Sequence, residues 1–327
     1  MKKTNLNRNC TIDILRLFFS ILVVAIHTSP FIEYNAILSY FCSQTLSRLA
    51  IPFFAGVAGY FYFKDKSKGK NLKYLKKYML IYSFWSTVMF TFDAVHWTGS
   101  ISSFVLYVLK TFFLTGWRQL WYLLAVIYVI CLLALGNRIS NRFNSFIYFC
   151  SFVFLAYGIA ADNYGKIFSA IRTISLIESF FQNSFVNLPM ILPFFMLGYT
   201  LNRPIPVKYN KHAFLIALSC IVGLLFEILL TTLFDLHENV VLCLFTYPSV
   251  YFLLIWALNN PYSDLSVAAK HCSGMASIIY LSHSLLQVHL VSNGFTPSLV
   301  FLICTLIPGF VGFILTKIDN PTFNKFI

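Results

Sequence analysis

The feature that most constrains this chain is a succession of long apolar stretches separated by short polar breaks. A helix needs about 20 largely apolar residues to cross the hydrocarbon core of a bilayer. Only 11% of the residues are charged, against about 25% in soluble domains. We therefore expect an all-α fold, a polytopic membrane helix bundle that forms a single domain over residues 1–327. The sequence predicts about ten transmembrane helices, at residues 11–30, 41–63, 78–97, 118–136, 144–162, 188–202, 213–232, 241–258, 273–291 and 298–316.

Three segments depart from this simple pattern. The sixth span is short, and its two prolines in "NLPMILPFFMLGYTLNR" are expected to kink or break the helix. The segment "TGSISSFVLYVLKTFFLTG" is too short to span and predicts a re-entrant or interfacial helix. The start of the chain is similar to a signal peptide, but Asp13 and Arg16 interrupt its apolar region and no small-x-small cleavage site follows. We expect an uncleaved first helix.

The distribution of basic residues predicts the orientation, because cytoplasmic loops retain lysine and arginine. The chain has 24 lysine and arginine residues. If the N-terminus is cytoplasmic, 18 of them lie on the cytoplasmic side, four lie on the outer side, and Arg16 and Arg48 fall within spans. Both termini are therefore predicted to be cytoplasmic. The four outer residues are Lys110, Arg118, Lys166 and Arg172.

The net charge of +13 comes mostly from these cytoplasmic basic residues, which membrane orientation accounts for. We therefore expect the protein to interact with the lipid bilayer and not with nucleic acid. The run "KDKSKGKNLKYLKK" is denser than orientation requires. It is typical of a surface that attracts anionic lipid headgroups, and a docking surface for a polyanionic cytosolic substrate is the alternative.

Two further patterns concern cysteine and tryptophan. The eight cysteines are scattered singly, without a C-x-x-C pair or metal-ligand spacing, so we expect neither disulfides nor a metal site. The tryptophans near span ends indicate an interfacial aromatic belt, formed by Trp85, Trp97, Trp117 and Trp121.

The first span carries three ionisable residues, which are costly in hydrocarbon and so are functional candidates. Arg16 and His27 are eleven residues apart, which returns to within about 20° of the same helix face and separates them by roughly 16 Å. Asp13 lies on much the same side. We expect this stripe to face the bundle interior. The alternatives are an i, i+3 ion pair between Asp13 and Arg16 near the interface, and a hydrogen-bonded interfacial His27.

Other spans add ionisable residues. Arg48 lies in an apolar run, followed by Pro52 and a small-residue face (Ala55, Gly56 and Gly59) that permits close helix approach. Glu227 is predicted to be the only other buried carboxylate, and His283 and His289 lie in the ninth span. His27, Arg48, Glu227 and one ninth-span histidine can share one polar layer. A structural pair of Arg48 with Glu227 is an equally good interpretation.

Several of these segments together resemble the integral-membrane acyltransferase 3 family of bacteria. "IDILRLFFSILVVAIH" is similar to its R-x(10)-H first-helix motif, through Arg16 and His27. "RLAIPFFAGVAGYFYF", "QLWYLLAVIYVI", "LPFFMLGYTLNR" and "IYLSHSLL" resemble its second, fourth, sixth and ninth helix motifs, so the likeness covers nearly the whole chain. The second-helix form especially resembles the branch with the membrane domains of vancomycin-resistance serine racemases.

The resemblance implies transfer of an acyl group, usually acetyl, from acetyl-CoA to a hydroxyl of a cell-envelope carbohydrate or similar acceptor. It implies a multi-pass protein of the bacterial plasma membrane with no permanently bound cofactor and with acyl-CoA as donor substrate. The catalytic residues are then His27, Arg16 and Arg48: His27 is the general base, Arg16 holds the donor, and Arg48 or a ninth-span histidine stabilises the oxyanion. The residues expected to bind substrate or acyl-CoA are Asp13, Arg16, Trp121, Tyr122, Glu227 and His283.

Two other functions fit the same features. In the racemase branch a cytoplasmic racemase domain follows the tenth helix, and such a fused or associated domain is a possible partner here. The alternative function is then that of a membrane domain acting in L-serine uptake, because intramembrane charges and broken helices also suit a transport path. A third possible function is export or assembly of surface polysaccharide without catalysis of a reaction.

Overall fold

The computed structural model describes residues 9–66, 71–140, 142–164, 166, 188–203, 207–236, 242–262 and 265–318. Within these residues the chain is helical and contains no strand. It is an all-helical membrane protein, and each predicted span overlaps at least one helix. The basic run at residues 64–77 lies partly outside the described residues, as do Arg172 and both chain ends, so the orientation stays a prediction.

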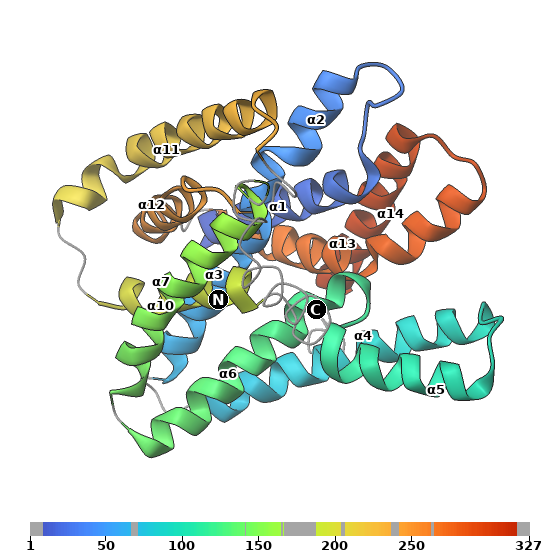
Figure 1. Ribbon diagram of the computed structural model, residues 1–327, viewed down its shortest axis with the longest axis horizontal. Helices are drawn as coiled ribbons and strands as arrows, with labels where there is room; N and C mark the ends of the chain where they lie inside the picture. Colours follow the sequence, from blue (N-terminus) through green and yellow to red (C-terminus); the bar gives the residue numbers. More distant parts are fainter. Residues whose placement is uncertain are drawn as a thin grey trace. The chain divides into compact units, whose positions relative to one another are not determined.

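The described residues form two compact units, which are treated separately below. The first contains residues 1–54, 204–226 and 245–327, and the second contains residues 55–203 and 227–244. Figure 1 follows the helices of each unit along the chain.

The first unit is built around α1 (Cys10–Thr28), α13 (Ser266–Ser292) and α14 (Pro297–Ile318). The last two form a helical hairpin, and α1 packs against α13 (Figure 1). A core of Val24, Ile279, Val300 and Cys304 joins all three helices. The unit also contains α2 (Ala36–Gln44), the beginning of α3 (Ala50–Lys66), most of α11 (Val207–Leu233) and α12 (Thr246–Asn259).

The N-terminus of α1 is fixed by short polar contacts. The side chain of Asn9 caps the helix by accepting a hydrogen bond from the Ile12 N–H at 3.0 Å, which satisfies one of the free N–H groups of the first turn. The Asn9 amide also donates to the Ala257 carbonyl at 2.8 Å, and the Cys10 N–H donates to the Pro261 carbonyl at 3.0 Å. The first helix is therefore tied to the end of α12.

The second unit contains the rest of α3 with α4 (Asn71–Val95), α5 (Ile101–Lys110), α6 (Trp121–Ile139), α7 (Phe143–Asp162) and α10 (Leu188–Leu201). The small-residue face predicted on α3 meets α10. A Cβ atom on Gly59 would lie 1.8 Å from the Phe195 carbonyl oxygen, and one on Gly198 would lie 2.0 Å from the Gly59 carbonyl carbon. The backbones thus approach as closely as glycine allows.

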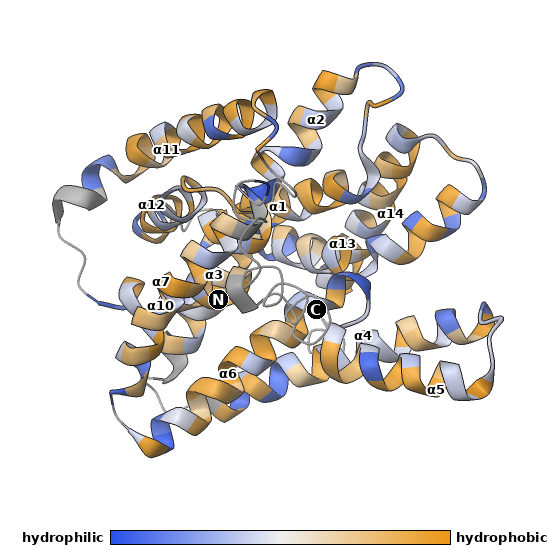
Figure 2. Ribbon diagram, viewed as in Figure 1, coloured by the Kyte–Doolittle hydropathy of each residue, from blue (hydrophilic) through white to orange (hydrophobic). Residues whose placement is uncertain are grey.

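Seven helical stretches within the described residues are long and apolar enough to cross a membrane. Apolar residues dominate α6, α11 and α14 along their lengths (Figure 2). The helices α10 and α12 have 14 residues each, fewer than the about 20 that a span needs. The sixth helix is not broken by its prolines, because α10 continues through Pro193.

The structure changes two details of the predicted spans. The second predicted span is interrupted by a 3-10 turn at Leu46–Leu49, between α2 and α3. Two tryptophans of the predicted aromatic belt are buried in the protein, Trp85 with 9% and Trp117 with 1% of its surface exposed. For Trp117 the reason is polar, because its indole N–H donates to the Asp93 carboxylate at 2.8 Å.

The segment after α4 forms the predicted short helix α5, which folds back beside α4 (Figure 1). It ends in a π-helical turn at Thr111–Thr115. A π-helical turn leaves carbonyls without their regular partners. The Tyr82 hydroxyl donates to the Phe112 carbonyl at 2.6 Å, and the Tyr128 hydroxyl donates to the Phe113 carbonyl.

Candidate active site

The ionisable stripe of α1 begins with an ion pair. Arg16 Nη1 lies 3.6 Å from Asp13 Oδ1, and Asp13 is 7% exposed. The same nitrogen donates to the Ser273 hydroxyl of α13 at 3.1 Å. The i, i+3 pair considered from the sequence is therefore present, and it is extended across to a second helix. The Arg16 side chain keeps 32% of its surface exposed.

The helix is continuous from Cys10 to Thr28, so the spacing of roughly 16 Å between Arg16 and His27 holds. Between these two positions the same face carries Ser20, Val23 and Val24, all buried. The stripe therefore faces the protein over most of its length, as the sequence predicts. His27 itself stands in the last turn of the helix and is exposed.

The end of α1 is held by three backbone contacts. The Ser29 N–H closes the helix on the Ala25 carbonyl at 3.0 Å, with Ser29 in the left-handed region at a φ of 46°. The Thr28 hydroxyl donates to the Val24 carbonyl at 2.9 Å. The Gln287 side-chain amide of α13 donates to the His27 carbonyl at 2.6 Å. These contacts fix the backbone from which the His27 ring projects.

The ring of His27 stacks on the ring of His283. The ring centroids are 5.3 Å apart and the planes are inclined by 30°. His283 is fully buried, and its Nδ1 lies 3.0 Å from the Ile279 carbonyl and 2.9 Å from the Tyr280 carbonyl. Its Nε2 has no hydrogen-bond partner among the residues that the structure describes.

Arg48 stands in the 3-10 turn between α2 and α3. Its Nη2 donates to the Gln44 side-chain carbonyl. The turn that carries Arg48 packs against α1. In the first unit His27 therefore contacts His283, and Arg48 stands in a turn that packs against α1. Glu227, the other member of the predicted polar layer, lies in the second unit, so the layer as a whole stays a prediction. Asp13 and Arg16 lie toward the other end of α1.

The predicted residue Glu227 lies in the second unit. One of its carboxylate oxygens, Oε1, accepts hydrogen bonds from the Asn163 amide at 2.9 Å, the Tyr164 hydroxyl at 3.2 Å and the Leu244 N–H at 2.8 Å. Glu227 is 6% exposed. These contacts join the end of α7 to the segment that precedes α12, and the predicted role of Glu227 in binding substrate stays a prediction.

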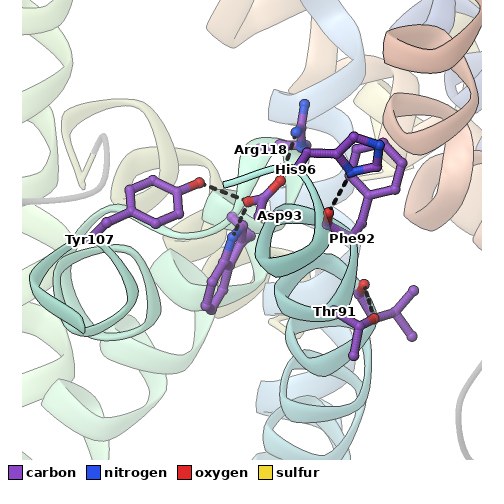
Figure 3. Close-up of polar contacts among 8 residues, drawn as sticks. Thr91, Phe92, Asp93, His96, Tyr107 and Arg118 are labelled. Atoms are coloured by element: carbon purple, nitrogen blue, oxygen red, sulfur yellow. Dashed lines mark hydrogen bonds and ion pairs between the residues drawn. The ribbon is translucent and has the colours of Figure 1, made fainter. Parts of the chain in front are cut away.

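Asp93 is a third carboxylate, half-buried as a residue, whereas Asp13 and Glu227 are the buried carboxylates among the described residues, as the sequence predicts. The Asp93 side chain is 10% exposed, although it stands within the predicted third span. It accepts hydrogen bonds from the Tyr107 hydroxyl and the Trp117 indole N–H, both at 2.8 Å, and from Arg118 Nη2 at 3.0 Å. Figure 3 shows these contacts converging on the carboxylate.

The Asp93 contacts shape the turn that leads into α6, where Trp121 and Tyr122 stand. This turn passes through two residues with positive φ, Gly116 at 77° and Arg118 at 45°. A Cβ atom on Gly116 would lie 2.3 Å from the Trp121 Cα. Tyr122 is 5% exposed and Trp121 is half-buried. Their predicted role in binding substrate stays a prediction.

The sequence did not predict four residues of this region. Ser273 and Gln287 contact predicted site residues, and Asp93 and Tyr107 form contacts at the turn before Trp121 and Tyr122. Asp93 had a usable signal, since it is an ionisable residue inside an apolar span. For Ser273 and Gln287 the sequence holds no such signal, because their contacts join residues about 260 positions apart.

The comparisons with known proteins give one family and one relative. The model of the acyltransferase domain, type 3, matches residues 11–318. A protein of Enterococcus faecalis named amino-acid racemase is 25% identical over 299 residues. The match covers 85% of this chain and 41% of that relative, so the chain spans less than half of the relative's length. No solved structure matches.

Proposed function

The chain belongs to the acyltransferase 3 family, and from that premise we propose that it is a membrane-bound O-acyltransferase. It moves an acyl group, acetyl in this proposal, from acyl-CoA on the cytosolic side of the bacterial plasma membrane. The acceptor is a hydroxyl of a carbohydrate or similar molecule on the outer side.

The observation that carries the proposal is the position of His27. It stands at the exposed end of a stripe that is buried in its middle, on a backbone held by Gln287, with Arg16 eleven residues earlier on the same face. A neutral imidazole has an ordinary pKa near 6.5 and can take a proton at neutral pH. General-base catalysis of this kind contributes about 10²–10⁴-fold.

Arg16 is suited to bind the acyl donor, acyl-CoA. Its guanidinium carries five N–H groups in a fixed fork, and the described contacts to Asp13 and Ser273 both use Nη1. The remaining N–H groups can bind phosphate oxygens of CoA in a bidentate manner. The roughly 16 Å along α1 between Arg16 and His27 is then covered by the pantetheine arm.

The reaction is an exchange of one ester for another. His27 removes the proton of the acceptor hydroxyl while the hydroxyl oxygen bonds to the thioester carbonyl carbon. The carbon–sulfur bond then breaks, the carbonyl is restored, and the CoA sulfur leaves as the thiol with the proton that His27 returns. The charge of Arg48, in the turn that packs against α1, is assigned to the oxyanion that forms between these two steps.

Acyl transfer in reconstituted vesicles tests this assignment. We expect His27→Ala to lower turnover by about 10²–10⁴-fold, with His96→Ala, an exposed histidine of the second unit, as the matched control. Arg16→Lys keeps the charge but loses the fork, so we expect a higher KM for acyl-CoA and a similar kcat. Undiminished turnover in the His27 variant would remove this residue from the mechanism.

The relative named amino-acid racemase favours a second candidate, a membrane module that takes up serine for a racemase domain. The two candidates differ in their ligand. A protein with a donor site is stabilised by acetyl-CoA, since any ligand that binds only the folded state raises its stability. Stabilisation by L-serine without any effect of acetyl-CoA would favour uptake over acyl transfer.

A further inference from the structure

The hydrogen bonds of His283 define which of its ring nitrogens carries a proton. Its Nδ1 faces two backbone carbonyls, Ile279 and Tyr280, and carbonyl oxygens only accept. Nδ1 must therefore carry the hydrogen. The ring is fully buried, and no carboxylate contacts it among the described residues, so a charged ring would be an uncompensated buried charge. In the neutral ring the other nitrogen, Nε2, is an acceptor.

This acceptor lacks a donor within the part of the chain that the structure describes. A buried polar atom without a partner is costly, and the exceptions in native proteins call for an explanation. The adjacent His27 ring does not supply the donor. A ring N–H lies in the ring plane, and the two planes are stacked at 30° with centroids 5.3 Å apart, so neither N–H of His27 is directed at the Nε2 lone pair.

The same geometry argues against one role considered from the sequence. A group that stabilises an oxyanion must donate a hydrogen bond. His283 has its donor committed to its own helix, and Nε2 presents a lone pair that repels negative charge. Of the groups considered for the oxyanion, this leaves Arg48 and His289.

We propose that His283 Nε2 accepts a hydrogen bond from the acyl acceptor, from a second hydroxyl beside the one that His27 deprotonates. The inference rests on the proposed acyl transfer and specifies its acceptor as a 1,2-diol or a molecule with an equivalent neighbouring donor. The two stacked rings then have different roles. His27 takes the proton of the reacting hydroxyl, and His283 binds the hydroxyl next to it, which places the reacting oxygen.

Two small alcohols serve as probes. Acetyl transfer from acetyl-CoA to 1,2-propanediol and to 1-propanol is measured in vesicles for the wild type, His283→Phe and the control His96→Phe. Phenylalanine keeps a ring that stacks on His27 but has no acceptor. We expect the wild type and the control to prefer the diol by about 5- to 150-fold in kcat/KM. We expect this preference to disappear in His283→Phe. An unchanged preference in that variant would overturn the proposal.

The thermal stability of the same variants separates this inference from the proposed function. Removal of an unpartnered buried acceptor should raise the Tm of His283→Phe above that of the wild type. A lowered Tm would mean that Nε2 already has a permanent partner, and it would overturn the inference even if no alcohol were acetylated. If the wild type transfers no acetyl group while the Tm of His283→Phe is raised, the acyl-transfer proposal is overturned, and the diol acceptor with it. If His283→Phe does not fold, His283→Gln, which retains an acceptor, and His283→Leu, which does not, give the same comparison.

Discussion

Gly312 of α14 lies against Gly274 of α13, so that a Cβ atom on Gly312 would come within 2.7 Å of the Gly274 carbonyl oxygen. The contact is between two backbones, which cannot move aside as a flexible side chain would. It aligns the helix that carries His283 with its partner in the hairpin.

We predict that Gly312→Ala lowers the Tm in detergent, because it overpacks the crossing at a cost of about 1–3 kcal/mol. Gly309→Ala is the matched control one turn earlier on the same helix. There a Cβ atom would meet the Ile279 side chain at 3.5 Å, an ordinary contact, so the Tm should stay the same or rise slightly. Equal effects of the two variants would show that α13 and α14 do not cross at this point.

The second prediction concerns the Asp93 carboxylate. An asparagine has a single acceptor oxygen, which can take the place of Oδ2 and accept from Tyr107 and Trp117. Its NH₂ group then faces Arg118 Nη2, so Asp93→Asn removes the hydrogen bond and the ion pair with Arg118. We expect a loss of about 1–3 kcal/mol in the free energy of unfolding, and a displaced turn before α6. Tyr107→Phe removes only one of the three donors and should cost less. The order of the two losses in denaturant or thermal unfolding checks this, and a larger loss for Tyr107→Phe would contradict it.

The helical part of this molecule follows from its sequence, and the polar contacts do not. The spacing of Arg16 and His27 fixes their common face because an isolated helix has one geometry, and α1 has that geometry. The partner of each residue lies on α13, about 260 positions along the chain. Such contacts depend on which helices pack together, and apolar periodicity carries no information about that choice. The acceptor state of His283 depends further on the rotamer that turns Nδ1 to its own helix.

The third prediction is a pH dependence at the loop after α1. Loss of solvation acts to raise the pKa of Glu33, but hydrogen bonds from the N–H groups of Glu33 and Ser298 and from the side chains of Ser298 and Thr296 lower it below the ordinary value of 4.5. The carboxylate accepts from the Ser298 N–H at 3.0 Å, in the first turn of α14.

A depressed pKa stabilises the folded state above the unfolded pKa, and this contribution is lost as the pH falls through the folded pKa. We expect Glu33→Gln to lower the Tm slightly near pH 7, with the difference from the wild type shrinking below about pH 4.5. Parallel melting curves between pH 3 and pH 7 measure it. A difference that grows on acidification would have the wrong sign for this contact.

The last prediction concerns Gln287, whose amide donates to the His27 carbonyl at 2.6 Å. Gln287→Met preserves length and removes the donor, so it frees the last turn of α1 without touching the His27 ring. Because small misplacements of a reacting group lower the chemical step, we expect kcat for acyl transfer to fall by about 10-fold or more, with the KM for acyl-CoA nearly unchanged. Ser282→Ala is the control on the same helix, since the Ser282 hydroxyl donates to the Ile278 carbonyl of its own helix at 2.8 Å. It should leave kcat as it is. If Gln287→Met raises the KM for acyl-CoA and leaves kcat intact, the contact serves donor binding and does not place the base.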